Sequence, residues 1–133
     1  MSVPLTVAET PFPDDLHHTV ITVAGDLEKP SVHLLRKVAD QAITNGRTKI
    51  ILNVHGVTFC DSTGLRELLT LLRQTYENSG WLRLAGVTGV LERLMTLTRL
   101  YDAFPVDPDL NASLRYVYGR DLIPETPPGG GPR

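Results

Sequence analysis

Three stretches of the chain have the hydrophobic pattern of β-strands. Residues 19–24, Thr-Val-Ile-Thr-Val-Ala, are rich in β-branched side chains, and Gly25 after them predicts that this strand stops there. Residues 49–54, Lys-Ile-Ile-Leu-Asn-Val, are nearly continuous in apolar character, which indicates a strand that is covered on both faces or paired centrally. Residues 81–85, Trp-Leu-Arg-Leu-Ala, predict a third strand that ends at Gly86.

Between and after these strands, apolar residues recur every three or four positions, as they do on the buried face of a helix. Pro30 suits the first turn of the first helix, and Asn45-Gly46 supplies its stop signal. The predicted helices span about residues 30–44, 62–78, 89–101 and 110–118, the third with Thr88 and the last with Asp109 as N-cap.

The helix predicted over residues 62–78 has clearly separated faces. Its buried stripe is predicted to consist of Leu65, Leu68, Leu69, Leu72 and Tyr76. Its exposed face is predicted to consist of Arg66, Glu67, Arg73, Gln74 and Glu77. Tyr76 and Trp81 are assigned to the core rather than to ligand stacking.

The two ends of the chain differ in composition from the centre. Residues 1–16 hold three prolines, which permit at most a short edge strand over residues 5–8. Residues 120–133 end in a run of proline and glycine and have little apolar surface to bury, so they predict a flexible tail. We therefore expect one domain over residues 1–119, with residues 1–16 as an N-terminal extension.

Strands that alternate with helices predict an α/β fold. We expect a four- or five-stranded mixed sheet with an antiparallel N-terminal edge, a short edge strand at residues 104–106 and helices mainly on one face.

Length and composition narrow the class of protein. With 133 residues, 41% apolar and 21% charged, the chain has enough material for one soluble domain. A net charge of −2 provides no basic face for nucleic acid and no polybasic patch for an anionic membrane. No apolar run approaches the roughly 18 residues of a membrane span, and the N-terminus lacks the pattern of a secretion signal. The single cysteine rules out a disulfide within the chain, so we expect the cytoplasm.

The residues that most often carry enzyme chemistry form no recognisable arrangement. Cys60 is better explained as a small core residue than as a thiol nucleophile, because no histidine is tied to it. The four histidines, at 17, 18, 33 and 55, lack the spacing of a metal site, and we expect them to be solvated or hydrogen-bonded. We expect neither catalysis nor a cofactor.

Residues 57–65, Val-Thr-Phe-Cys-Asp-Ser-Thr-Gly-Leu, are the most informative stretch, because a loop after the central strand is predicted to meet a helix start there. Helix N-termini leave backbone N–H groups unpaired, and the oxygens of Asp61, Ser62 and Thr63 suit them. Gly64 destabilises a helix relative to alanine, which close approach by a neighbour or partner would offset. The residues alone leave open that Asp61, Ser62 and Thr63 merely cap the helix.

The stretch Asp61-Ser62-Thr63-Gly64-Leu65 resembles the signature of the STAS domain family, in particular the anti-sigma factor antagonists. In that family an apolar strand and a Gly-Val-Thr-Phe-like loop precede Asp-Ser-Ser/Thr-Gly-Leu. Residues 23–27 resemble the family's Gly-Glu-Leu-Asp strand end, and residues 82–87 resemble its fourth strand and following loop. The order of elements agrees over about residues 18–118.

The resemblance implies a protein switch rather than an enzyme. The unphosphorylated antagonist would bind an anti-sigma factor that is also a serine kinase, and would thereby free the sigma factor. Phosphorylation of Ser62 would release the antagonist, and a serine phosphatase would reset it. Thr63 is a second candidate acceptor, for which a capping role is at least as good an explanation.

The loops that follow parallel strands gather at one edge of a sheet, so Asp26 and Glu28 should lie near Ser62. The residues predicted to bind the partner are Asp26, Glu28, Asp61, Ser62, Thr63, Gly64 and Arg66.

Two other functions stay open from the sequence. One is a STAS-like scaffold or a module that binds a lipid, nucleotide or other small molecule, with Ser62 only a cap. The other is a small hydrolase that uses Ser62 or Cys60, for which the sequence offers no base and no oxyanion arrangement.

Overall fold

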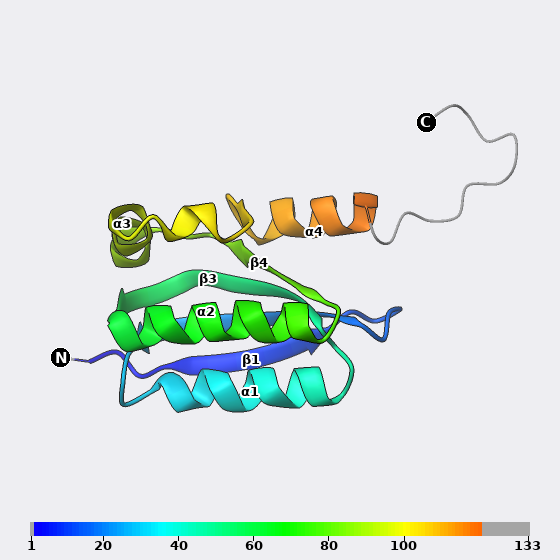
Figure 1. The fold of residues 1–133 in the computed structure, drawn as a ribbon, viewed down its shortest axis with the longest axis horizontal. Coiled ribbons are helices and arrows are strands. Elements are labelled where there is room, and N and C mark those ends of the chain that lie inside the picture. Colours follow the sequence, from blue (N-terminus) through cyan, green and yellow to red (C-terminus); the bar gives the residue numbers. More distant parts are fainter. Residues whose placement is uncertain (1, 121–133) are drawn as a thin grey trace, which may run out of the picture.

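The computed structural model describes residues 2–120, which form one five-stranded sheet with helices on both faces (Figure 1). The strand order is β1-β2-β3-β4-β5, with β1 antiparallel to β2 and every other pair parallel. The strands are β1 Thr6–Pro11, β2 His18–Leu27, β3 Lys49–Cys60, β4 Trp81–Ala85 and β5 Val106–Asp107. The helices are α1 Val32–Thr44, α2 Ser62–Glu77, α3 Gly89–Leu97, the short 3₁₀ turn η1 Leu100–Asp102, and α4 Leu110–Arg120. The predicted α/β class and mixed sheet are confirmed.

The main core lies between the sheet and α1, α2 and α3, where Leu35, Leu68 and Met95 are fully buried. In Figure 1, α1 and α2 lie side by side across this face. A smaller core on the opposite face brings Ile51 of β3 together with Val117 of α4. Strand β3 is therefore covered on both faces, which explains why its first half carries apolar residues at consecutive positions.

Two strands run further than their patterns predict. Gly25 does not end β2, which continues to Leu27, and β3 continues to Cys60. The two extensions pair with each other, with Leu27 opposite Cys60, so the residues predicted to form a loop are strand. Gly25 has φ +100°, beside a register shift, and a Cβ there would lie 2.1 Å from the carbonyl oxygen of Pro4. Glycine at this position lets the strand bend past the N-terminal segment instead of stopping it.

Helix α2 is rotated relative to the predicted stripe. Glu67, expected on the exposed face, is only 3% exposed, and Tyr76, expected in the core, is 58% exposed. Leu71 and Thr75 take inward positions, both fully buried. Arg36 of α1 explains the burial of Glu67, because its guanidinium pairs with that carboxylate at 2.5 Å and joins the two helices.

Smaller differences concern the ends of elements. The edge strand β1 spans Thr6–Pro11 rather than residues 5–8, and β5 lies at Val106–Asp107 rather than at residues 104–106. The third helix ends at Leu97, because Arg99 adopts φ 61° and the chain continues as η1. The side chain of Thr88 makes no cap hydrogen bond, whereas Asp109 accepts one from the backbone N–H of Ala112. The predicted tail lies outside the described residues, except for Arg120, which ends α4.

Candidate functional site

The candidate site lies where β2 and β3 end and α2 begins, and Asp61 is the residue that joins these elements. One carboxylate oxygen, Oδ1, accepts a hydrogen bond from the backbone N–H of Gly64 at 2.9 Å and so caps α2. The other, Oδ2, accepts from the backbone N–H of Lys29 at 3.1 Å, in the loop between β2 and α1. Asp61 also donates its own N–H to the carbonyl of Leu27. The carboxylate therefore fixes the two loops relative to each other.

Ser62 is the first residue of α2 and is exposed. No hydrogen bond among residues 2–120 involves its hydroxyl, and the side-chain cap of α2 comes from Asp61. Thr63 is half-buried and its hydroxyl is likewise unused within the described part of the chain. The three residues that the sequence offered as possible caps therefore have different roles.

Gly64 is buried, and it allows α2 to begin in contact with the sheet. A Cβ at this position would lie 2.4 Å from the carbonyl oxygen of Leu27 and 2.7 Å from the sulfur of Cys60. Of the two explanations that the sequence left open for Gly64, a neighbour or a partner in close approach, the neighbours within the chain make the approach. Gly64 therefore supports the residues at the start of α2 and, being buried, exposes little surface to a partner.

Asp26 and Glu28 lie on the neighbouring strand end, as predicted, but their carboxylates face different surroundings. Asp26 is buried: Thr58 donates its hydroxyl to one oxygen at 2.6 Å, and the backbone N–H of Val3 donates to the other at 2.9 Å. These hydrogen bonds, that from Thr58 first, lower the pKa of Asp26. Glu28 is half-buried, and its backbone carbonyl accepts the hydrogen bonds that start α1. Arg66 is exposed one turn after Ser62.

Phe59 was missed by the sequence reasoning and belongs to this surface. It pairs in register with Asp26 near the end of β3, and its ring is 42% exposed. An exposed phenylalanine beside polar residues is typical of contact surfaces rather than of cores. Its signal in the sequence is an apolar residue immediately before Cys60 and Asp61, in a stretch that the pattern predicts to be a loop.

Cys60 is buried beneath the site. Burial, together with the nearby charge of Asp61, raises the pKa of its thiol to about 12. The thiol donates to the carbonyl of Asp61 at 3.4 Å. An enclosed thiol with a raised pKa fits the predicted role of a small core residue.

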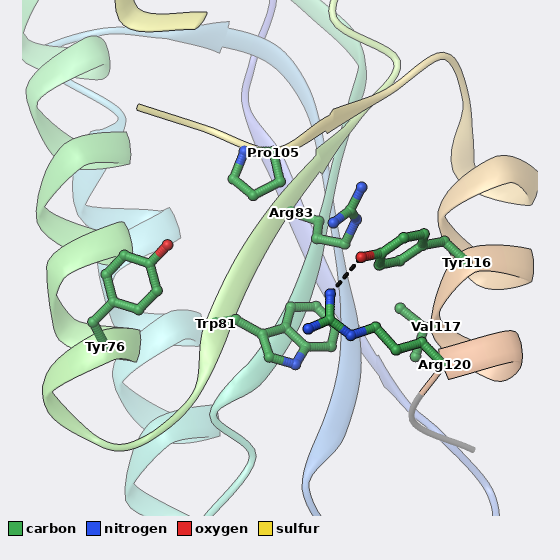
Figure 2. Close-up of a pocket in the computed structure, with 7 residues that line it drawn as sticks. All are labelled: Tyr76, Trp81, Arg83, Pro105, Tyr116, Val117 and Arg120. Carbon is green, nitrogen blue, oxygen red and sulfur yellow. Dashed lines mark hydrogen bonds between the residues drawn. The ribbon is translucent and has the colours of Figure 1, made fainter. Parts of the chain in front are cut away.

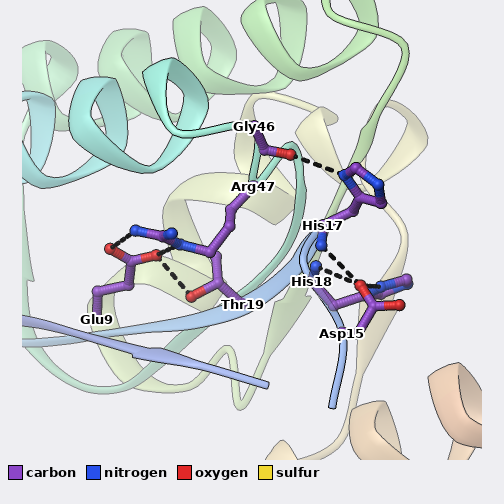
Figure 3. Close-up of polar contacts among 7 residues, drawn as sticks. All are labelled: Glu9, Asp15, His17, His18, Thr19, Gly46 and Arg47. Carbon is purple, nitrogen blue, oxygen red and sulfur yellow. Dashed lines mark hydrogen bonds and ion pairs between the residues drawn. The ribbon is translucent and has the colours of Figure 1, made fainter. Parts of the chain in front are cut away.

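The adjacent histidines lie where β2 begins, at the end of that strand opposite to the candidate site, and Figure 3 shows their polar contacts. His18 is buried and its Nδ1 lies 2.6 Å from the carboxylate of Asp15, a partner that the sequence reasoning did not identify. His17 contacts the carbonyl of Gly46 at 3.2 Å. Within residues 2–120, no three His, Cys, Asp or Glu side chains gather as a metal site requires. The expectation of hydrogen-bonded histidines holds for this pair.

Comparisons with known proteins point to the same family as the residues at the start of α2. The family model described as "Mlab, STAS domain" matches residues 12–106. An anti-sigma-B factor antagonist of Staphylococcus aureus is 30% identical over 87 residues, which cover 65% of this chain and 81% of that protein.

Two solved structures share the fold. An anti-sigma factor antagonist from Mycobacterium paratuberculosis has a TM-score of 0.71 at 21% identity, covering 85% of this chain and 93% of the other. The Bacillus cell fate determinant SpoIIAA, solved in its phosphorylated form, has a TM-score of 0.61 at 23% identity, covering 82% and 99%. Among the described helices, none has the length and apolar character needed to span a membrane.

Proposed function

This chain belongs to the STAS domain family, in its anti-sigma factor antagonist type, and from that premise we propose that it binds an anti-sigma factor and is released when Ser62 is phosphorylated. The anti-sigma factor would itself be the serine kinase, and a serine phosphatase would restore the binding form. The protein acts by association in the cytoplasm, where the sigma factor works, and carries out no reaction of its own.

The observation that carries the proposal is that Asp61 caps α2 while the Ser62 hydroxyl takes no part in the cap. Asp61 uses both carboxylate oxygens to hold backbone N–H groups, so the helix start does not depend on the Ser62 hydroxyl. That hydroxyl is exposed and makes no hydrogen bond within the described residues. A kinase can therefore reach it, and its modification removes no contact that holds the fold together.

The electrostatics of the site favour a switch in binding rather than in folding. A phosphate adds roughly −1.5 to −2 charges, which the partial positive charge of a helix N-terminus tolerates. The same charge falls beside Asp61, on a surface that would otherwise present a neutral hydroxyl. A loss of about 1.4 kcal/mol in binding is already tenfold, so repulsion or a steric clash in a water-free contact is sufficient.

The partner surface that we propose surrounds Ser62 and combines polar and aromatic groups. It comprises Asp26, Glu28, Phe59, Asp61, Ser62, Thr63, Gly64 and Arg66. Phenylalanine and arginine, the residue types of Phe59 and Arg66, are enriched in protein–protein interfaces, and arginine is common among the residues that contribute most binding energy. Asp26 and Gly64, which are buried, contribute by holding the shape of this surface.

The test uses the full chain and the anti-sigma kinase. Mass spectrometry after incubation with ATP should find phosphate on Ser62. Ser62→Ala should retain affinity and resist ATP-driven release, whereas Ser62→Asp should bind at least about tenfold more weakly. Ser79→Asp is the matched control, since it places the same charge in the exposed turn after α2 and should bind as the unmodified protein does. Equal affinity of Ser62→Asp and Ser79→Asp would refute the proposal.

A further inference from the structure

The pairing between the ends of β2 and β3 is irregular at Thr58. Gly25 lies opposite Val57, whereas the next residue of β2, Asp26, lies opposite Phe59. Strand β3 therefore has one residue more than β2 at this point, and Thr58 is the residue with no partner opposite it, which defines a β-bulge. Bulges are rare between parallel strands, and next to functional sites they change the direction of a side chain. This bulge lies shortly before the start of α2.

The bulge determines which side chains at the end of β3 face the core. Successive side chains of a regular strand alternate between its two faces, so without a bulge Val57 and Phe59 would point to the same side. Instead Val57 and Cys60 are buried, at 7% and 2% exposure, whereas Phe59 is 42% exposed. The extra residue therefore moves Phe59 to the solvent side and brings Cys60 into the main core.

Asp26 holds the bulge from the neighbouring strand. Its Oδ1 accepts a hydrogen bond from the Thr58 hydroxyl at 2.6 Å, which ties the extra residue to β2 through its side chain. Its Oδ2 accepts from the backbone N–H of Val3, and its own N–H donates to the Val3 carbonyl, both at 2.9 Å. Asp26 is therefore fixed on one side by the N-terminal segment and holds Thr58 on the other.

We propose that the bulge at Thr58 sets Phe59 as the apolar anchor with which this chain contacts the anti-sigma factor, and that Thr58 and Asp26 are positioning residues for it. This inference rests on the proposed function, in which the partner covers Ser62. Aromatic residues are enriched at protein interfaces, and a few anchors that become buried there contribute most of the binding energy. The partner should therefore present an apolar pocket for the ring, beside groups that fit an unmodified serine hydroxyl.

The ring of Phe59 and the hydroxyl of Ser62 belong to one end of the sheet. The backbone N–H of Asp61 donates to the carbonyl of Leu27, the residue that follows Asp26 in β2. The bulge and the start of α2 are thus joined through the same strand end. A partner that covers Ser62 is placed to cover Phe59 as well, which lies three residues earlier in the chain.

Tyr76 provides a matched control, because it is an exposed aromatic residue at the other end of α2. It stands on one wall of a hollow of about 250 Å³ beside β4, which Trp81 and Tyr116 also line (Figure 2). Ser62 is the first residue of α2, and Tyr76 lies in its last turn, 14 residues further along. At 1.5 Å per residue, the two are about 21 Å apart along the helix. Truncation of Tyr76 therefore removes an exposed ring far from the proposed contact.

The affinity of the full chain for the anti-sigma kinase, measured without ATP, tests the anchor. Phe59→Ala should weaken binding at least about tenfold, whereas Tyr76→Ala should leave it unchanged. Thr58→Val keeps the shape of the side chain but cannot donate to Asp26, and it should weaken binding about threefold. Thr58→Ser keeps the hydroxyl and should bind as the native chain does. In the Phe59→Ala background, Thr58→Val should cause no further loss, because it acts through the ring.

A second measurement follows the ring in the free protein. The chain has three phenylalanines, of which Phe12 and Phe104 are buried, so labelling with para-fluorophenylalanine gives three fluorine NMR signals. The signal of Phe59, identified by its absence in Phe59→Ala, should respond to exchange of light for heavy water, as an exposed fluorine does. Thr58→Val should shift this signal and leave the other two in place, which also shows that the fold is intact.

Equal affinities of Phe59→Ala and Tyr76→Ala would overturn the proposed anchor. An unchanged Phe59 signal in Thr58→Val, or losses of affinity that multiply in the double variant, would overturn the positioning role of Thr58. The test of the switch is separate. If Ser62→Asp loses affinity and Phe59→Ala does not, the switch stands and the anchor is wrong. The opposite pair of results would support the anchor and refute the switch.

Discussion

The polar side chains near the two ends of α2 differ in the hydrogen bonds that they make. At its start, a single carboxylate, that of Asp61, meets the needs of the backbone and leaves the Ser62 hydroxyl unused. At its end, the nearby side chains satisfy one another, with Arg83 on Asp107 and Arg120 on Tyr116. The first end offers an accessible group that can be changed covalently. The second offers side chains that are already bonded to one another.

The comparison shows that the availability of a polar side chain depends on which hydrogen bonds its neighbours already make. Serine at a helix start usually serves as a cap, and the sequence alone leaves that explanation open for Ser62. Because Asp61 has taken the capping role, the hydroxyl is available for another purpose. In the same way, the Arg83 guanidinium is oriented by Asp107, whose carboxylate accepts hydrogen bonds from its Nε and Nη2.

The largest expected effect comes from filling the space under the helix start. Alanine normally stabilises a helix by about 1 kcal/mol relative to glycine, but Gly64→Ala should lower the free energy of unfolding by about 2–3 kcal/mol, because the new Cβ meets backbone at 2.4 Å. Gly119→Ala in α4 is the control, since nothing lies within 4 Å of its Cβ, and it should be neutral or slightly stabilising. Urea unfolding followed by Trp81 fluorescence measures both. A neutral Gly64→Ala would mean that α2 does not start in close contact with β2.

The next effect concerns the carboxylate that joins the two loops. Asp61→Ala removes acceptors for the N–H groups of Gly64 and Lys29 and should lower the free energy of unfolding by about 2 kcal/mol. Asp61→Asn keeps one of the two oxygens and should lose about half as much. Equal losses in the two variants, measured by the same urea unfolding, would show that one of the two hydrogen bonds contributes nothing.

A third prediction concerns the acid sensitivity of the ion pair between Asp107 and Arg83. The hydrogen bond from Arg83 lowers the pKa of Asp107 below its ordinary value, against the opposing effect of burial. The stabilisation is therefore complete above the unfolded pKa of about 3.9 and is lost as the pH falls through the lower folded value. Between pH 6 and pH 3, the native chain should lose about 1 kcal/mol more stability than Asp107→Asn.

Denaturant unfolding across that range checks the prediction, and identical pH profiles would contradict it. Some acid sensitivity should remain in the variant, because the pKa values of Glu9, Asp15 and Asp26 are lowered as well. Only the difference between the two profiles is attributed to Asp107.

The smallest effect is expected at Ser62 itself. Ser62→Asp should change the free energy of unfolding by less than about 0.5 kcal/mol, or raise it slightly, because an acidic group at a helix N-terminus is favourable. Thermal or urea unfolding of the isolated protein measures this. A loss comparable to that of Asp61→Ala would show that the hydroxyl supports the fold, and the switch would then act through unfolding rather than through binding.

Much of the fold was predictable because its elements have strong local signals. The apolar run of β3 and the helical periodicity of α1 and α2 need no tertiary information to be recognised. The continuation of β2 past Gly25 was not predictable, because it depends on pairing with a β3 extension 33 residues away. The burial of Glu67 likewise depends on Arg36, which comes from another helix.

The sequence predicted which residues come together at the start of α2, but not which hydrogen bonds each of them makes. The signature from Asp61 to Leu65 marks the helix start, and the parallel order of the strands places Asp26 and Glu28 beside it. Asp26 was expected on the partner surface, whereas the structure buries its carboxylate against Thr58 and Val3. Phe59 was assigned to a loop, and only the strand pairing places it at the edge of the site.

By itself, the sequence determined the class of fold, the position of the helix start and the family, because hydrophobic periodicity and a short motif are local properties of a chain. Only the tertiary structure decided which oxygen caps α2, why Gly64 must lack a side chain, and that a pocket lined by tyrosine and tryptophan side chains opens beside β4. Each of these depends on groups distant in sequence that come within a few ångströms of one another, and no local pattern records such distances.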